Sequence, residues 1–237
     1  QNVQQLVVKT GELIQEKSTH EQRYEGISSK KKVPFLYLEG DGVLIRGQRK
    51  TRLEIHRFQV SEGTEKRGNR STMIHSHFVS HLNRQQAQKE LMDYLQATYD
   101  LKETIVVSNS DGGSGYETDV FEELSLGCLR HEHFRDKYHV HQKIKERLNF
   151  APFLQKKLIE AVSQYDFGKV QACLDTAESL IEEEHEEKYK EQLRLLTAYL
   201  QRNWGYLCPL KARGIQDKRA CIGTIESTHR KMTYRMK

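Results

Sequence analysis

The sequence feature that most constrains the fold is a change of hydrophobic periodicity near Pro152. Between about residues 33 and 136, short apolar and β-branched segments alternate with turn residues, a pattern that predicts strands. Residues 152–203 instead carry Leu, Ile and Ala at helical spacing with no proline after Pro152. This spacing predicts two or three helices that end near Trp204. A chain with this order of segments is expected to form an α/β core that carries an all-α insertion.

Local patterns place the individual elements. Apolar and β-branched residues dominate 33–45, with a Gly-Asp-Gly break at 40–42, so we expect two strands joined by a tight turn. The same criteria predict further strands at 51–60, 73–82, 104–108 and 131–136. Amphipathic spacing predicts helices at 83–99 and 138–148.

The chain divides into four segments. Residues 1–25 are polar with a loose apolar stripe and run into Gly26 and a basic stretch at 30–32, so 1–32 is expected to be a helical connector. The remaining segments are the first part of the α/β core, the helical insertion and a return to the core with a last helix, over residues 33–150, 151–205 and 206–237.

Composition excludes some classes of protein and favours a polyanion as partner. The 237 residues contain no run of about 18 apolar residues and no signal-peptide pattern, so we expect a cytoplasmic protein without a membrane span. Residues 30–70 contain eleven Lys and Arg and five acids, and residues 210–237 contain eight Lys and Arg and two acids. Such basic segments suit DNA, although surface lysines also serve solubility.

Two aspartates follow strand-type segments at glycine-rich positions. Asp41 lies between Gly40 and Gly42, and Asp111 precedes Gly112 and Gly113. Acids at strand ends line the ligand crevice of an open sheet, and Mg²⁺ and Mn²⁺ prefer carboxylate oxygens. Asp and Gly are also ordinary turn formers, so a metal site and a plain turn are both open interpretations.

A third acid, Glu226, lies in a cation-rich segment over residues 222–231 that predicts an early helical turn. A glutamate among Lys and Arg commonly forms only a surface ion pair. Two His-x-His pairs, at 75/77 and 131/133, have no further ligands at firm spacing. We therefore expect exposed or packed histidines there rather than a zinc site.

Several short motifs follow one another in a fixed order, with the helical block before the glutamate. They are Leu36-Tyr37-Leu38-Glu39-Gly40-Asp41-Gly42-Val43, Val106-Val107-Ser108-Asn109-Ser110-Asp111-Gly112-Gly113, Asp136-Lys137-Tyr138-His139, and Gly223-Thr224-Ile225-Glu226-Ser227 with Tyr234-Arg235-Met236-Lys237. Over about residues 33–237 the sequence thereby resembles bacterial insertion-sequence transposases of the Lre-two group. That group belongs to the DDE superfamily and is akin to the Mutator-like transposases.

The resemblance implies an RNase H-like mixed sheet with flanking helices, and an all-α insertion before the last catalytic residue. It implies that Asp41, Asp111 and Glu226 form the catalytic triad and hold two Mg²⁺ or Mn²⁺ ions. It also implies metal-dependent DNA strand cleavage and strand transfer. Asp136 and His139 match the C/D-x-x-H pattern of the Mutator-like group, whose histidine lies near the active site; Cys128 and His131 offer the same pattern in its Cys form.

The same resemblance predicts the partners. Arg230, Lys231 and Arg235 are expected to contact DNA phosphates, and residues 1–32 to lead from an upstream DNA-binding region. The active form is expected to be a homo-oligomer. Two alternatives remain open: an inactive or domesticated fragment that acts as a DNA-binding or interaction domain, and a metal-dependent RNase H-like nuclease without joining activity.

Overall fold

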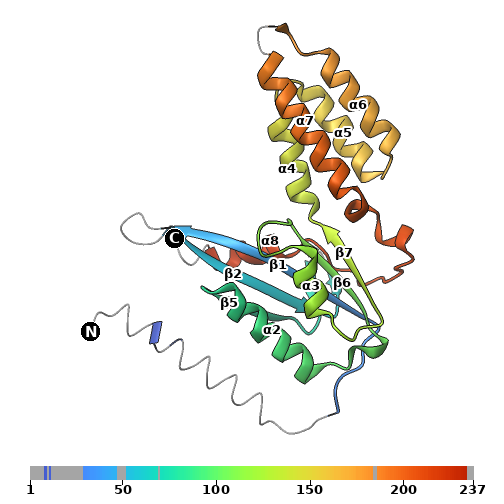
Figure 1. Cartoon of the computed structure of the whole chain (residues 1–237). Coiled ribbons are helices and arrows are strands. Elements are labelled where there is room, and N and C mark those ends of the chain that lie inside the picture. The colour runs from blue at the N-terminus through green and yellow to red at the C-terminus, as the bar shows by residue number, and fades with distance from the viewer. Residues whose placement is uncertain are drawn as a thin grey trace.

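The computed structural model describes residues 29–46, 52–68, 70–183 and 186–233, together with residues 8, 9 and 11. Most of the predicted connector over 1–32 therefore lies outside the described residues. The described chain forms a mixed β-sheet with helices on both faces, and a helical unit extends beyond one edge of the sheet (Figure 1). The predicted α/β class is confirmed.

The five strands of the sheet lie in the order β5-β2-β1-β6-β7. Their bounds are Phe35–Arg46 for β1, Arg52–Ser61 for β2, His77–His81 for β5, Ile105–Ser110 for β6 and Arg130–Arg135 for β7. The pairs β1–β2 and β2–β5 are antiparallel, whereas β1–β6 and β6–β7 are parallel. The central strand β1 thus joins an antiparallel half of the sheet to a parallel half.

The prediction of a turn at residues 40–42 is wrong. β1 continues through both glycines as one strand, and it pairs with β2 from Tyr37 to Arg46. A Cβ on Gly40 would lie 2.8 Å from the ring of Phe58 and 2.9 Å from that of Tyr116. Close side-chain packing explains Gly40, and the ladder to β2 overrides the turn preference of the Gly-Asp-Gly triplet.

The predicted strand at 73–82 is wrong in its first half. Met73 ends a separate two-stranded ribbon formed by β3 (Thr64–Arg67) and β4 (Arg70–Met73). His75 then has a φ of 44°, in the left-handed region that interrupts an extended strand. The strand β5 therefore begins only at His77.

Both faces of the sheet are covered because successive strand residues point to opposite sides. On one face lie α2 (Arg84–Thr98), whose N-cap Asn83 accepts a hydrogen bond from the backbone N–H of Gln86, and α3 (Thr118–Leu124). Their shared core includes Leu36, Leu38, Phe58, Val79, Leu91 and Phe121. On the other face lie α8 (Ile225–Thr233) and the segment before it, over a core of Tyr37, Val107, Phe134, Ile215 and Cys221.

The helical unit comprises α4 (Lys137–Arg147), α5 (Pro152–Ser163), α6 (Phe167–Ser179) and α7 (Glu186–Asn203). It has a hydrophobic core of its own, in which Ile144, Leu158, Leu196 and Leu200 are fully buried. Pro152 opens α5, as expected for a residue without an N–H to donate. The predicted helices at 83–99 and 138–148 and within 152–203 are confirmed, and the 3₁₀ turns Trp204–Leu207 and Leu210–Arg213 return the chain to the sheet.

Candidate metal centre

Asp41 lies within β1, and Asp111 is the first residue after the neighbouring strand β6. The parallel pairing of β1 with β6 ends at Glu39 and Asn109, and each aspartate follows two residues after its member of this last pair. Side chains two residues apart point to the same face of a sheet. Both aspartates therefore belong to the face that carries Glu39, which is the face covered by α8.

A buried carboxylate fixes the start of α8. Glu39 is 2% exposed, and its oxygens accept hydrogen bonds from the backbone N–H groups of Thr224 and Ile225, each at 2.9 Å. The hydroxyl of Thr224 donates a third at 2.8 Å. Burial raises the pKa of Glu39, although these hydrogen bonds oppose the shift. The carboxylate satisfies N–H groups that a helix N-terminus leaves without partners.

A second polar contact joins α8 to β2. The amide of Gln59 donates to the hydroxyl of Thr224 at 2.7 Å and accepts from the hydroxyl of Thr228 at 3.1 Å. The helix is therefore held across β1 and β2, directly beside Asp41. This docking brings Glu226, which is distant in sequence, to the face of the sheet on which Asp41 lies.

Asp41, Glu226 and His229 form a compact cluster. One potential ligand atom from each of the three lies within 4.8 Å of the others. The Nδ1 atom of His229 is 3.4 Å from Oδ2 of Asp41 and 3.9 Å from Oε2 of Glu226. The side chains of Asp41 and His229 are 13% and 7% exposed, whereas that of Glu226 is 35% exposed. The cluster is thus open to solvent on the Glu226 side.

Asp111 lies near this cluster, but among the described residues the set of ligand atoms within 4.8 Å does not include it. One oxygen of Asp111 accepts a hydrogen bond from the backbone N–H of Gly113 at 2.7 Å. Its negative charge still acts on Asp41, whose pKa it raises. The predicted triad is therefore brought into one region, although the compact set joins only Asp41 and Glu226 with His229.

The electrostatics of the cluster favour a cation. The pKa of Asp41 is raised to about 7, first by burial and then by repulsion from Asp111 and Glu226. Burial, with a contribution from nearby Arg57, lowers the pKa of His229 to about 4, so its imidazole is neutral at pH 7. Two carboxylates and a neutral imidazole are a donor set that fits a divalent cation, which would also offset the repulsion.

Asp136 and His139 lie at the junction of β7 and α4. One oxygen of Asp136 caps α4 by accepting from the N–H of Tyr138 at 2.6 Å, and the other is 3.8 Å from Nδ1 of His139. Asp136 raises the pKa of His139, and the charges of Asp111 and Asp41 add to this effect. His139 therefore lies in the negative field of the cluster, while its role there stays a prediction.

The loop after β6 is held by a buried arginine. Gly112 has a φ of 74°, and a Cβ at this position would overlap the guanidinium of Arg135. Arg135 is 9% exposed, and its Nε donates to Oδ1 of Asn203 at 2.9 Å. Because Asn203 ends α7, this contact connects the helical unit to the loop that carries Asp111.

Some predicted residues cannot be placed in the site. Arg235 and the side chains of Arg230 and Lys231 lie outside the described residues. Among the residues that the structure describes, no further metal ligands join His131 and His133. Both rings contact the hydroxyl of Ser108, at 2.7 and 2.8 Å. The expectation of packed histidines at 131 and 133 agrees with these contacts.

The sequence reasoning did not single out His229 or Glu39. A signal for His229 was present, since it follows Glu226 by three residues, and such residues share a face of a helix. Glu39 stood within the first motif, but nothing local shows that it caps a helix that begins 186 residues later in the chain. That contact arises only when α8 docks on β1.

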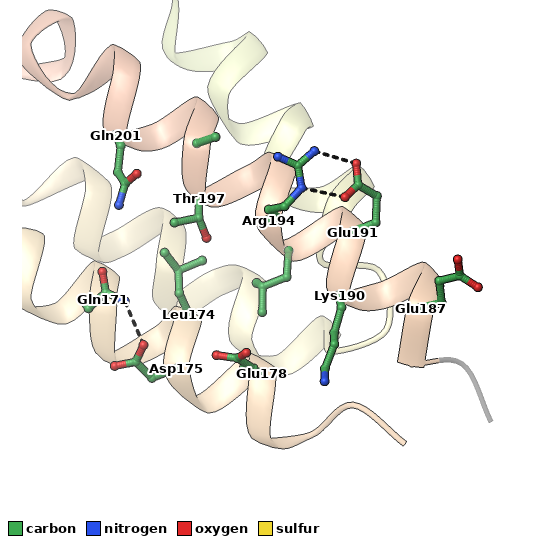
Figure 2. Close-up of a pocket in the computed structure, with 12 residues that line it drawn as sticks. Gln171, Leu174, Asp175, Glu178, Glu187, Lys190, Glu191, Arg194, Thr197 and Gln201 are labelled. Atoms are coloured by element: carbon green, nitrogen blue, oxygen red, sulfur yellow. Dashed lines mark hydrogen bonds and ion pairs between the residues drawn. The ribbon is translucent and has the colours of Figure 1, made fainter. Parts of the chain in front are cut away.

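A separate groove lies between α6 and α7, far along the chain from the aspartates (Figure 2). Its charged side chains are Asp175, Glu178, Glu187, Glu191, Lys190 and Arg194. Figure 2 shows that Arg194 is engaged by Glu191, through contacts of 2.7 and 2.8 Å. The excess of acids makes this groove unsuitable for phosphate groups.

Within the described part of the chain, no helix combines the length and apolar character needed to cross a membrane. The fold and the cluster together define an α/β protein with a carboxylate–histidine centre on one face of a mixed sheet, beside its central strand.

Comparison with known proteins shows the family to which the chain belongs. The model of UPF0236, an uncharacterised protein family, matches residues 1–237, and the chain belongs to this family. A relative from Streptococcus gallolyticus, described as "UPF0236 protein in vanSb 3'region", is 39% identical over 211 residues. The match covers 87% of this chain and 46% of that relative. The chain thus spans about half the length of the curated relative that it matches.

Proposed function

We propose that this chain is the catalytic part of a DDE-type DNA transposase with an RNase H-like core. In this proposal Asp41, Asp111 and Glu226 hold divalent cations, and the enzyme cleaves DNA strands and joins the freed ends to a target. The mixed sheet with helices on both faces and an all-α unit before α8 is compatible with the fold that the resemblance implies.

The observation that carries the proposal is the convergence of Asp41 and Glu226. They are 185 residues apart in the sequence, and their carboxylates meet, together with His229, on the face of the sheet that α8 covers. Asp111, the first residue after β6, is near enough for its charge to act on Asp41, which supports the proposal. The pKa of Asp41 is raised first by burial and then by repulsion from Asp111. A bound cation would offset both effects by stabilising the carboxylate.

The residues of the chain have separate tasks in this proposal. The three carboxylates hold the cations and set their geometry, and none acts as a covalent nucleophile. Glu39 and Gln59 keep α8 in place and thereby position Glu226. Cations bound there would activate a water molecule or a DNA 3′-hydroxyl and stabilise the leaving oxygen. The predicted contacts of Arg230, Lys231 and Arg235 would neutralise phosphates.

The test is a DNA strand-cleavage assay with end-labelled duplexes from the sequences that flank the gene, in the presence of Mg²⁺ or Mn²⁺. We expect nicking that needs the cation and that falls by at least about 100-fold, or 2.7 kcal/mol of transition-state stabilisation, in Asp41→Asn, Asp111→Asn and Glu226→Gln. Joined products on a second labelled duplex would demonstrate strand transfer. Cleavage without joining would instead indicate an RNase H-like nuclease.

Acids in the helical unit supply matched controls. Asp175→Asn and Glu178→Gln make the same chemical changes in the groove between α6 and α7, and we expect both to cleave like the wild type. The proposal fails if Asp41→Asn and Asp111→Asn cleave as well as these controls. DNA binding that persists while no variant or wild-type chain cleaves would favour a DNA-binding fragment.

A further inference from the structure

We infer that His229 supplies a nitrogen ligand to a cation held with Asp41 and Glu226, and that this centre therefore prefers a divalent transition metal such as Mn²⁺ to Mg²⁺. The inference rests on the proposed function, because it concerns the same centre. It adds a ligand that the three-carboxylate set lacks, and it gives the centre a metal preference.

The geometry points to His229 because its ring nitrogen faces both carboxylates. Nδ1 lies 3.4 Å from an oxygen of Asp41 and 3.9 Å from an oxygen of Glu226. Protein ligands that share one ion at 2.0 to 2.2 Å from it stand about 3 to 4 Å apart. Nδ1 is therefore already spaced from each carboxylate as ligands of one ion are, and the ligand atoms of all three residues lie within 4.8 Å of one another.

His229 is also held rigidly. Its side chain is 7% exposed, and it lies on α8 one turn after Glu226. The start of this helix is fixed by the hydrogen bonds of its backbone to Glu39. A ligand that is already fixed by the fold loses little conformational entropy when a cation binds.

The identity of the donor determines which cation is favoured. Mg²⁺ takes oxygen ligands in near-octahedral geometry and keeps several water molecules. Imidazole nitrogen is a usual ligand of divalent first-row transition metals. An imidazole in place of an oxygen thus weakens the site for Mg²⁺ relative to Mn²⁺, while the two carboxylates serve both ions.

A different role for His229 is possible on the same geometry: its N–H could donate to Asp41 and only orient that carboxylate. In that case the ring nitrogen does not touch the ion, and replacing it affects Mg²⁺ and Mn²⁺ alike. Spectroscopy of the bound ion separates the two roles, because only direct ligation couples the ¹⁴N nucleus of the ring strongly to an unpaired electron.

The experiment uses Mn²⁺ and Mg²⁺ themselves as probes of the purified chain. Electron spin-echo envelope modulation of the Mn²⁺ complex should show ¹⁴N coupling in the wild type and in His139→Gln, and none in His229→Asn. Asn places an amide near the position of Nδ1, and thermal unfolding checks that the variant is folded. Calorimetric titration should show a loss of Mn²⁺ affinity of about tenfold or more in His229→Asn, and a smaller loss for Mg²⁺.

Three outcomes would overturn the inference. If Mn²⁺ binds in a way that Asp41→Asn abolishes but shows no ¹⁴N coupling, His229 is not a ligand, while the proposed function stands. If the coupling disappears in His139→Gln instead, the nitrogen ligand is His139. If neither ion binds, or if Asp41→Asn leaves binding unchanged, the metal centre of the proposed function fails as well. Because the wild-type spectrum alone tests for a nitrogen ligand, the inference stays falsifiable even if His229→Asn does not fold.

Discussion

Replacing Asp41 by Asn should make the metal-free protein more stable at neutral and alkaline pH. The pKa of Asp41 in the folded chain is about 7, against an ordinary value of 3.8. At pH 8 the folded chain therefore carries a buried charge that is repelled by Asp111 and Glu226. Asn has nearly the same shape, and its carbonyl oxygen can still accept the hydrogen bond that Asp41 receives from the N–H of Gly42 at 2.8 Å.

The direction and size of this change in the free energy of unfolding follow from the protons that the folded and unfolded chains bind. Below pH 3.8 Asp41 is protonated in both the folded and the unfolded chain, and it adds no pH dependence. Between pH 3.8 and about 7 the folded chain keeps a proton that the unfolded chain has lost, so stability falls as the pH rises. A shift of about three pKa units corresponds to at most about 4 kcal/mol. Because buried sites relax around a charge, we expect a gain of about 1–3 kcal/mol for Asp41→Asn at pH 8.

The assay is urea unfolding in a chelating buffer at pH 4.5, 6 and 8, followed by circular dichroism and by the fluorescence of Trp204. The advantage of Asp41→Asn should be smallest at pH 4.5 and grow with pH. Asp175→Asn, at an exposed position of α6, should show no such growth. Saturating Mn²⁺ should stabilise the wild type and not Asp41→Asn. A difference that stays constant with pH, or a less stable Asp41→Asn at pH 8, would refute the reasoning.

Three further substitutions test other parts of the fold. Glu39→Gln removes an acceptor from the start of α8, so it should lower the free energy of unfolding by about 1–3 kcal/mol. Because Glu39 positions the helix that carries Glu226, the substitution should also weaken Mn²⁺ binding. Unchanged urea midpoints and unchanged Mn²⁺ titrations would contradict this. Gly112→Ala forces a left-handed backbone and a clash with Arg135. It should cost about 2 kcal/mol or more in chemical denaturation. Leu196→Ala truncates a fully buried side chain of the helical unit and should cost about 2–5 kcal/mol; a loss below 1 kcal/mol would mean that this core is loosely packed.

Much of the fold could be predicted because its elements have strong local patterns. The helix beginning after Asn83 has a capping residue and regular apolar spacing, and the structure begins it at Arg84. The strand before Asp111 is short, apolar and followed by glycines, and it appears as β6. Pro152 correctly marked the start of α5. In each case the local preference of the chain and the tertiary structure agree.

Where prediction failed, tertiary contacts overrode local preference. Gly40-Asp41-Gly42 has the composition of a turn, but pairing with β2 and close contact with Phe58 keep it extended. The left-handed backbone at His75 gave no local signal, and it divided a predicted strand between the ribbon and the sheet. Short segments have nearly equal local preferences, so long-range pairing decides between them.

The candidate site also combines features that the sequence indicates with features that only the tertiary structure explains. By itself, the sequence supplied candidate carboxylates: two aspartates at glycine-rich positions and a glutamate in a predicted helix. Only the tertiary structure decided that these residues meet. Parallel pairing of β1 and β6 brings Asp111, just after β6, near enough for its charge to act on Asp41, and Glu39 holds α8 so that Glu226 and His229 reach Asp41. Both contacts join segments far apart in the chain, and their geometry depends on the packing of the whole sheet rather than on any local pattern.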